Sequence, residues 1–239
     1  MGTTTLLTEP AKPPAQFDKY AENYDAALNE GLSATGESKD YFAQRRVLWL
    51  SQCLRQMAVR PKRILDYGCG TGSTAKLFLD LLQPDSVTGV DSSIKSVALA
   101  SQAQSERTQF FVNSHFRPKQ DIDLAYCNGV FHHILPNDRT AELGYIARSL
   151  RQGGLFAFWE NNPWNPGTRY VMSRIPFDRD AVPLAPNSAR TLLRNNGFEI
   201  LRTDFLFFFP KALGFFRPIE LWFSRVPLGG QYQILCRRP

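Results

Sequence analysis

The central part of the chain alternates between short apolar runs and longer segments in which apolar residues recur every three or four positions. Short apolar runs bounded by turn residues predict buried strands, and the three-to-four spacing predicts helices. The predicted strands are 63–66, 86–90, 109–113, 122–127 and 155–160, followed by 198–209 and 230–236. The predicted helices are 16–28, 41–59, 73–82, 94–104, 138–150 and 188–196.

This alternation indicates βαβ units, and therefore an α/β fold with a mostly parallel sheet and helices on both faces. We find no internal repeat and no second core, so residues 16–239 are expected to form one domain. Residues 1–15 are rich in Thr, Pro and Ala and are predicted to be disordered. Within the domain we expect a helical cap at 16–60 and two substrate-side insertions at 161–187 and 205–227, the first with little regular structure.

The composition supports a folded protein, with 43% hydrophobic and 13% aromatic residues. The net charge of +6 comes from scattered basic residues, which argues against a nucleic-acid substrate. Four cysteines without C-x-x-C spacing are expected to be reduced thiols in a cytoplasmic protein. No signal peptide is recognisable, and no apolar run reaches the roughly 20 residues of a membrane span.

The segment 64–72, ILDYGCGTG, is the most informative part of the sequence. It leads from a predicted strand through a glycine-rich turn into a helix, and glycines at 68, 70 and 72 let the backbone approach a ligand. Their Gly-x-Gly-x-Gly spacing differs from the Gly-x-Gly-x-x-Gly of dinucleotide sites. Asp66 would repel a pyrophosphate but suits a ligand with an ammonium or sulfonium group, which favours S-adenosylmethionine over a nicotinamide cofactor.

A second acid, Asp91, ends the next predicted strand. An acid in this position can accept hydrogen bonds from both hydroxyls of a ribose. A glycine-rich loop or a strand-end acid is usually structural when it occurs alone. Together, in this order and in a strand–turn–helix context, the two features predict a nucleoside-type cofactor site.

Four segments, 64–72, 87–91, 124–134 and 150–160, resemble successive motifs of the Rossmann-like, class I S-adenosylmethionine-dependent methyltransferases. The resemblance extends over residues 16–160 and is strongest for the small-molecule branch that includes quinone-pathway methyltransferases. It implies a seven-stranded sheet with an antiparallel last strand. It also implies transfer of a methyl group from S-adenosylmethionine, with S-adenosylhomocysteine as product.

The same resemblance assigns parts of the cofactor to residues of this chain. The loop with Asp66, Gly68, Cys69, Gly70 and Gly72 would hold the methionine portion, and Asp91 the ribose. Ser92, Asn113 and Ser114 would lie beside the adenine, where the family commonly has an Asp. Asn128 would face the sulfonium, and Tyr20 and Tyr24 would cover the cofactor from an N-terminal helix, unless they are simply core residues.

Methyl transfer mainly requires alignment of the nucleophile, methyl carbon and sulfur, so no metal is needed, and the sequence shows no metal-ligand cluster. A hydroxyl acceptor would also need a general base. His132 and His133 follow the fourth predicted strand, at the edge where the acceptor is expected, and His133 is the first candidate. Glu160, at the end of the fifth strand, is another candidate that would face the same edge. The alternative is that both histidines only shape the pocket.

The acceptor itself is left open by the sequence, as is O-, N- or C-methylation. Three arginines at 169, 174 and 179 suit either solvent or an anionic acceptor. The aromatic residues of 205–223 suit the core, the wall of a site for a lipid-like acceptor, a dimer interface, or peripheral contact with the inner membrane surface. Two other functions remain as alternatives: a non-catalytic methyltransferase-like subunit and a nicotinamide-dependent oxidoreductase.

Overall fold

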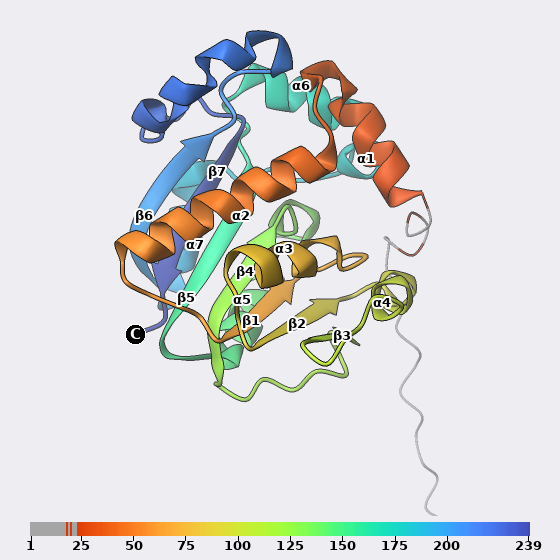
Figure 1. Ribbon diagram of the computed structural model, residues 1–239, viewed down its shortest axis with the longest axis vertical. Coiled ribbons are helices and arrows are strands. Elements are labelled where there is room, and N and C mark those ends of the chain that lie inside the picture. Colours follow the sequence, from red (N-terminus) through yellow and green to blue (C-terminus); the bar gives the residue numbers. More distant parts are fainter. Residues whose placement is uncertain (1–17, 19, 21–22) are drawn as a thin grey trace, which may run out of the picture.

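The computed structural model describes Asp18, Tyr20 and residues 23–239, except for the side chain of Tyr24 (Figure 1). The predictions made for residues 1–15 therefore lie outside the described residues. In the described part of the chain, no helix has the length and apolar character needed to cross a bilayer.

A seven-stranded sheet forms the centre of the fold, with the order β3-β2-β1-β4-β5-β7-β6. The strands are β1 Arg63–Tyr67, β2 Ser86–Asp91, β3 Thr108–Val112, β4 Ile122–Asn128, β5 Leu150–Asn161, β6 Glu199–Leu206 and β7 Gln231–Arg237. Strands β1 to β5 pair in parallel, and β7 is antiparallel to both of its neighbours. The predicted fold class is confirmed. Because the strand order reverses between β1 and β4, their carboxyl ends open the crevice where ligands bind in such sheets.

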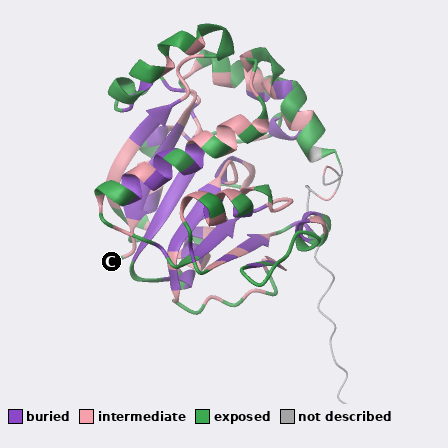
Figure 2. Ribbon diagram, in the orientation of Figure 1, coloured by how far each residue is buried: buried purple, intermediate pink, exposed green. Residues whose placement is uncertain are grey.

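Helices cover both faces of the sheet. The α-helices are α1 Tyr24–Leu32, α2 Lys39–Gln56, α3 Ser73–Leu81, α4 Ile94–Ser101, α5 Arg139–Ser149, α6 Pro166–Arg174 and α7 Pro186–Asn195, and the 3-10 helices are η2 Ser33–Thr35, η3 Phe131–His133, η4 Pro176–Asp178 and η5 Lys211–Phe223. One core cluster joins α2, α3 and α4 to the sheet, and a second joins α5 and α7 to its other face. Figure 2 shows the strands largely buried between these layers.

Three elements differ from their predictions. The predicted helix 16–28 lies partly outside the described residues, and in the described part of the chain α1 begins at Tyr24 and continues to Leu32. The strand predicted at 155–160 begins earlier, at Leu150, and accommodates a positive φ at Gly153. The insertion 161–187 contains helix α6, because Asn165 caps its first turn through the Thr168 amide and a proline occupies the first helical position, where no amide hydrogen is needed.

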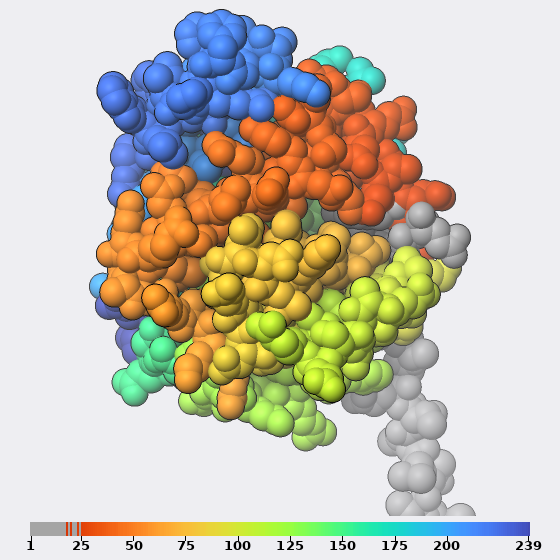
Figure 3. Space-filling view, viewed as in Figure 1, coloured from red at the N-terminus to blue at the C-terminus, as the bar shows by residue number. Residues whose placement is uncertain are grey.

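The second insertion divides into two parts with opposite surroundings. Phe205 and Leu206 are buried at the end of β6, whereas most of η5 is exposed. Non-helical geometry at Leu213 and the proline at 218 interrupt η5, as expected for a segment of short helical pieces. Together with α1 and α6, η5 forms one pole of the molecule, beyond the sheet (Figures 1 and 3).

Candidate active site

The glycine-rich loop after β1 is fastened to the end of β2 by Asp91. One carboxylate oxygen of Asp91 accepts a hydrogen bond from the Gly70 amide at 2.9 Å, and the other accepts one from the Ser93 amide at 2.8 Å. Burial raises the pKa of Asp91, while these backbone bonds oppose the shift. Asp91 thus sets the shape of both loops, in addition to any contact with a ligand.

The glycines of this loop do different things. At Gly70, where φ is +54°, the space that a side chain would occupy is open. At Gly68 and Gly72 a Cβ would instead collide with Val130 and Phe110. Only Gly70 therefore offers its open side to a ligand, and Gly68 and Gly72 permit close packing. Cys69 is buried beside Gly89 and points into the core.

Three buried side-chain oxygens at the carboxyl edge of the sheet have no hydrogen-bond partner among the described residues: Asp66 Oδ2, Asn113 Oδ1 and Asn128 Oδ1. They come from the ends of β1, β3 and β4. Unpaired buried acceptors are costly, so a bound ligand with donor groups would satisfy them. Burial and the nearby Asp91 raise the pKa of Asp66 to about 7, and Arg46 opposes this shift. These acceptors fit the ammonium and adenine amine of S-adenosylmethionine.

Arg46 is a site residue that the sequence did not reveal. Its guanidinium, on α2, donates to the Tyr126 hydroxyl at 3.2 Å and to Gln231 Oε1 at 3.0 Å. In the described part of the chain it forms no ion pair with a carboxylate, and it lines the cavity at the end of β4. A buried cation with neutral partners only is suited to an anionic ligand group.

The remaining predicted cofactor residues lie around this edge. Ser92 and Ser114 are exposed next to the ends of β2 and β3. The Tyr20 ring packs edge-on against Phe177, with 5.5 Å between the ring centroids. The side chain of Tyr24 lies outside the described residues. A hydrogen bond of 2.6 Å from the Ser93 hydroxyl to Asp18 ties the chain before α1 to the start of α4.

The two adjacent histidines occupy different environments. His132 is buried between two carboxylates, with Nδ1 2.6 Å from Glu160 Oε2 and Nε2 3.5 Å from Asp178 Oδ1. His133 Nε2 lies 3.3 Å from the same Asp178 oxygen. The second Glu160 oxygen accepts a hydrogen bond from the Phe131 amide at 2.8 Å. Glu160 is therefore buried behind His132, and the expectation that it faces the acceptor side was wrong.

These surroundings separate the protonation states of the two rings. Burial alone would lower the pKa of His132, but Glu160 and Asp178 outweigh it and raise that pKa to about 10. For His133, burial and the neighbouring His132 lower the pKa despite the bond to Asp178. At neutral pH His132 is an imidazolium and His133 is a neutral imidazole that can accept a proton.

The fold also assembles a set of possible metal ligands that the sequence did not show. His132, His133 and Asp178 each offer a ligand atom, and these atoms lie within 4.8 Å of one another. The sequence contained no such cluster because Asp178 belongs to η4, far along the chain from the two histidines. The same atoms account for the charged arrangement described above, since both nitrogens of His132 face carboxylates.

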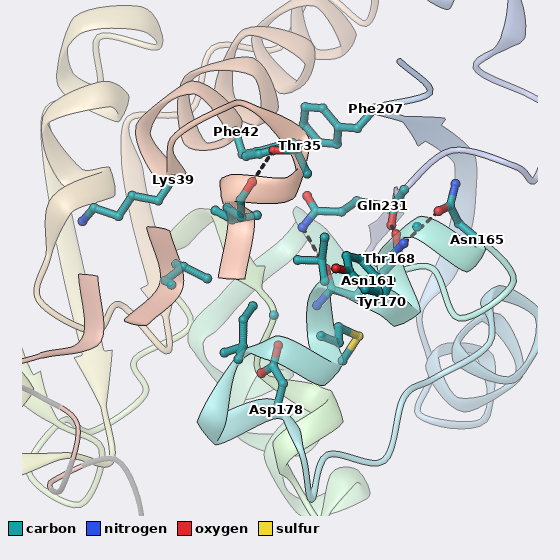
Figure 4. A pocket seen from close by; sticks show the side chains of 18 of the residues that line it. Thr35, Lys39, Phe42, Asn161, Asn165, Thr168, Tyr170, Asp178, Phe207 and Gln231 are labelled. Atoms are coloured by element: carbon teal, nitrogen blue, oxygen red, sulfur yellow. Dashed lines mark hydrogen bonds between the residues drawn. The ribbon is translucent and has the colours of Figure 1, made fainter. Parts of the chain in front are cut away.

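A cavity of about 380 Å³ opens next to the histidines (Figure 4). Its large apolar side chains are Leu28, Leu32, Phe42, Val171, Met172, Ile175, Phe177, Phe207, Phe208 and Phe209. Asn128, His132, His133 and Asp178 mark its inner end. Phe42 of α2 and Phe207 pack edge-on against each other in the cavity wall, with ring centroids 4.9 Å apart. Of the aromatic segment 205–223, residues 207–210 line this cavity, so only this part of the segment fits the alternative of an acceptor-site wall.

The geometry is that of a class I methyltransferase fold with a two-part site. One part consists of the loop bonded to a strand-end acid and the unpaired acceptors at the sheet crevice, and the other is the adjoining apolar cavity. The methyltransferase domain family matches residues 41–210. The chain belongs to this family of S-adenosylmethionine-dependent enzymes, as the sequence motifs predicted.

Relatives to which the chain is similar are named for different substrates. A trans-aconitate 2-methyltransferase from Rhodopseudomonas palustris is 24% identical over 57% of this chain and 54% of its own length. A demethylmenaquinone methyltransferase from Thermotoga maritima is 28% identical over 66% of this chain and 65% of its own length. The chain thus matches less than two thirds of either relative. A Thermotoga maritima structure described as a possible histamine N-methyltransferase has a TM-score of 0.64 at 17% identity, covering 93% of this chain and 98% of that one.

Proposed function

We propose that this protein transfers the methyl group of S-adenosylmethionine to a small lipophilic acceptor. The observation that carries the proposal is the set of three unpaired buried oxygens at the carboxyl ends of β1, β3 and β4. They match a ligand with several donor groups, and their sheet edge adjoins an apolar cavity. When bound, the cofactor supplies a methyl group already activated by its sulfonium.

The charges at this edge suit a zwitterionic amino-acid group. We assign Asp66 to the ammonium and Arg46 to the carboxylate of the methionine portion, because both are buried and neither has an ion-pair partner in the described part of the chain. Asp91 is assigned to the ribose and Asn113 to the adenine amine. Asn128 lies between this group of residues and the cavity, on the side of the reacting methyl group.

On the acceptor side, His133 is assigned as the general base for a hydroxyl acceptor. His132, held as an imidazolium by Glu160 and Asp178, has no free nitrogen to accept a proton. It positions Asp178, which in turn orients His133. The proposed transfer needs no metal, because the methyl group is already activated by its sulfonium. The relatives that act on a quinone or on aconitate fit a small-molecule acceptor, and the apolar walls favour a lipophilic one.

Cofactor binding tests the proposal directly. Isothermal titration calorimetry should show binding of S-adenosylmethionine and S-adenosylhomocysteine and none of NAD. Asp91→Ala should weaken binding by about 1.5–3 kcal/mol, because it removes charged hydrogen bonds. Asp85→Ala, at an exposed position before β2, is the matched control and should leave affinity unchanged. Binding of NAD would favour the oxidoreductase alternative, and cofactor binding without methyl transfer to any acceptor would favour the non-catalytic subunit.

Cofactor affinity should also depend on pH through Asp66. Its carboxyl must be ionised to accept bonds from an ammonium group, and its pKa is raised to about 7. Affinity for S-adenosylhomocysteine should therefore fall as the pH is lowered through this value, by up to about tenfold per pH unit. Asp66→Asn, which cannot ionise, should bind more weakly at pH 8 and lose this dependence. A wild-type affinity that stays constant from pH 5 to 8 would contradict the assignment of Asp66.

A further inference from the structure

The exposed apolar side chains of residues 213–228, here called the aromatic cap, form an unusual surface. Trp222 is 86% exposed and Phe215 is 72% exposed. The other large apolar members are Leu213, Phe216, Ile219, Leu221, Phe223 and Leu228, all at least 39% exposed. Contiguous apolar surface of this kind marks an interaction site on a protein that folds in water.

Two of the three charged side chains of η5, Arg217 and Glu220, point in the opposite direction, whereas Lys211 at its start is exposed. Arg217 forms an ion pair of 2.8 Å with Glu37, and its guanidinium lies 4.7 Å from the centre of the Tyr41 ring. Glu220 is buried and accepts hydrogen bonds from the Phe208 and Phe209 amides. A surface helix normally buries its apolar residues and exposes its polar ones. Here η5 is anchored by its charged groups, and it presents its apolar residues outward.

Along residues 211–228 and helix α6 the exposed charges have one sign, whereas α1 at the same pole carries the exposed acids Asp25 and Glu30. The single acid of residues 211–228 is the buried Glu220, whereas Lys211 and Arg225 are exposed. Helix α6 and the residue pair before it add exposed Trp164, Tyr170, Arg169 and Arg174, with no acid among residues 164–175. Aromatic side chains with interspersed cations are typical of surfaces that sit at the headgroup level of an anionic membrane.

The aromatic cap and α6 border the mouth of the cavity. The Asn165 side chain donates to the Leu228 carbonyl, and the Thr168 hydroxyl donates to the Gly230 carbonyl, both at 2.7 Å. Residues 207–210, just before η5, and Tyr170, Val171 and Met172 of α6 line the cavity. In Figure 3, η5 forms the pole of the molecule beside the N-terminal helices. A bilayer at this pole would face the cavity directly.

We propose that the aromatic cap and α6 dock on an anionic lipid bilayer, from which a lipophilic acceptor enters the cavity. The inference rests on the proposed function for the identity of the acceptor site, but the docking itself is a separate property of this surface. An acceptor that moves directly from the bilayer into the cavity avoids the cost of exposing its apolar surface to water.

Vesicle flotation tests the docking. Wild-type protein should float with vesicles of phosphatidylcholine and phosphatidylglycerol, and bind pure phosphatidylcholine more weakly. Phe215→Ser/Trp222→Ser should lower the partition coefficient by about tenfold for each side chain removed from the apolar layer. Lys211→Ala/Arg169→Ala should lower it about fivefold per charge, and only on the anionic vesicles. Ile94→Ser, at a 64% exposed position on α4, is the matched control and should float like wild type.

The outcomes separate this inference from the proposed function. If the wild type binds S-adenosylhomocysteine but does not float with anionic vesicles, the docking is wrong and the methyltransferase assignment stands. If it floats but binds no cofactor, the assignment fails and the docking stands. If light scattering shows a wild-type dimer and a monomeric Phe215→Ser/Trp222→Ser variant, with no flotation, the surface joins two copies of the chain. If Phe215→Ser/Trp222→Ser unfolds, Lys211→Ala/Arg169→Ala decides the question. Flotation of this charge variant equal to that of the wild type on both vesicle types overturns the proposal.

Discussion

His133→Ala should reduce kcat for a hydroxyl acceptor by about 10²–10⁴-fold, the usual contribution of a general base. The imidazole is neutral at physiological pH, because burial and the adjacent His132 charge lower its pKa. It is held by Asp178 at 3.3 Å and lines the cavity. Cofactor affinity should stay within about twofold of wild type, since the unpaired oxygens assigned to the cofactor lie on other strands. The measurement is transfer of a tritiated methyl group to acceptors from a fractionated lipid extract.

The chain supplies its own control for this experiment. His115→Ala removes the third histidine, which is exposed after β3, and should leave turnover unchanged. Wild-type turnover should rise with pH up to the lowered pKa of His133 and stay level above it.

Turnover within about threefold of wild type in His133→Ala would restrict this residue to shaping the pocket. Loss of wild-type turnover in a chelator would instead indicate that the cluster of His132, His133 and Asp178 holds a metal.

Glu160→Gln should destabilise the fold by about 3–5 kcal/mol, because it leaves a buried charge without its nearest partner. Glu160 is 1% exposed and lies 2.6 Å from the His132 ring. The glutamine can still accept the Phe131 amide bond, so the substitution tests the charge pair instead of the backbone contact. The free energy of unfolding in urea gives the measurement. Glu106→Gln, at an exposed site before β3, should change it by less than about 0.5 kcal/mol.

The pH dependence gives a second readout of the same pair. The pKa of His132 is raised in the folded state to about 10. Its contribution to stability is therefore complete below about pH 6.5, the unfolded value, and is lost as the pH rises to about 10. The decrease in the free energy of unfolding between about pH 6.5 and 10 should be smaller in Glu160→Gln than in the wild type. The double variant His132→Gln/Glu160→Gln should recover part of the stability, because the buried imidazolium and its nearest carboxylate are removed together and Asp178 keeps its contact with His133. A single variant as stable as wild type would show that the pair is not an ion pair.

The parallel core of the sheet was predictable because strands buried on both faces appear as continuous apolar runs. Helix α6 was missed for a reason that the sequence contains. The prolines of this segment suggest irregular structure, yet Asn165 followed by proline at 166 is a helix start. The inward orientation of Arg217 and Glu220 turns the apolar side of η5 outward. It depends on Glu37, just before α2, and on the Phe208 amide, just after β6, and has no local signal.

Some residues of the site likewise have a local sequence signal, and others depend on the packing of distant segments. Asp66, Gly70 and Asp91 could be predicted because they belong to two short segments joined by direct hydrogen bonds. Arg46 and Asp178 could not, because only the packing of α2 and η4 against the sheet edge brings them there. The prediction that Glu160 faces the acceptor followed from its strand end alone. Alternation along β5 gives only two directions, and the folded chain turns this side chain towards η3.

Asp178 lies within the 161–187 segment, the same segment whose helix α6 shapes the acceptor cavity. Under the proposed function, this one segment carries both the residues that select the acceptor and the carboxylate shared by the two histidines. A relative could acquire a different acceptor by replacing this segment, but it would keep a working proton acceptor only if an acid returned to the same place. In a chimera that receives this segment from another family member, retention of that acid should decide whether a new specificity comes with turnover.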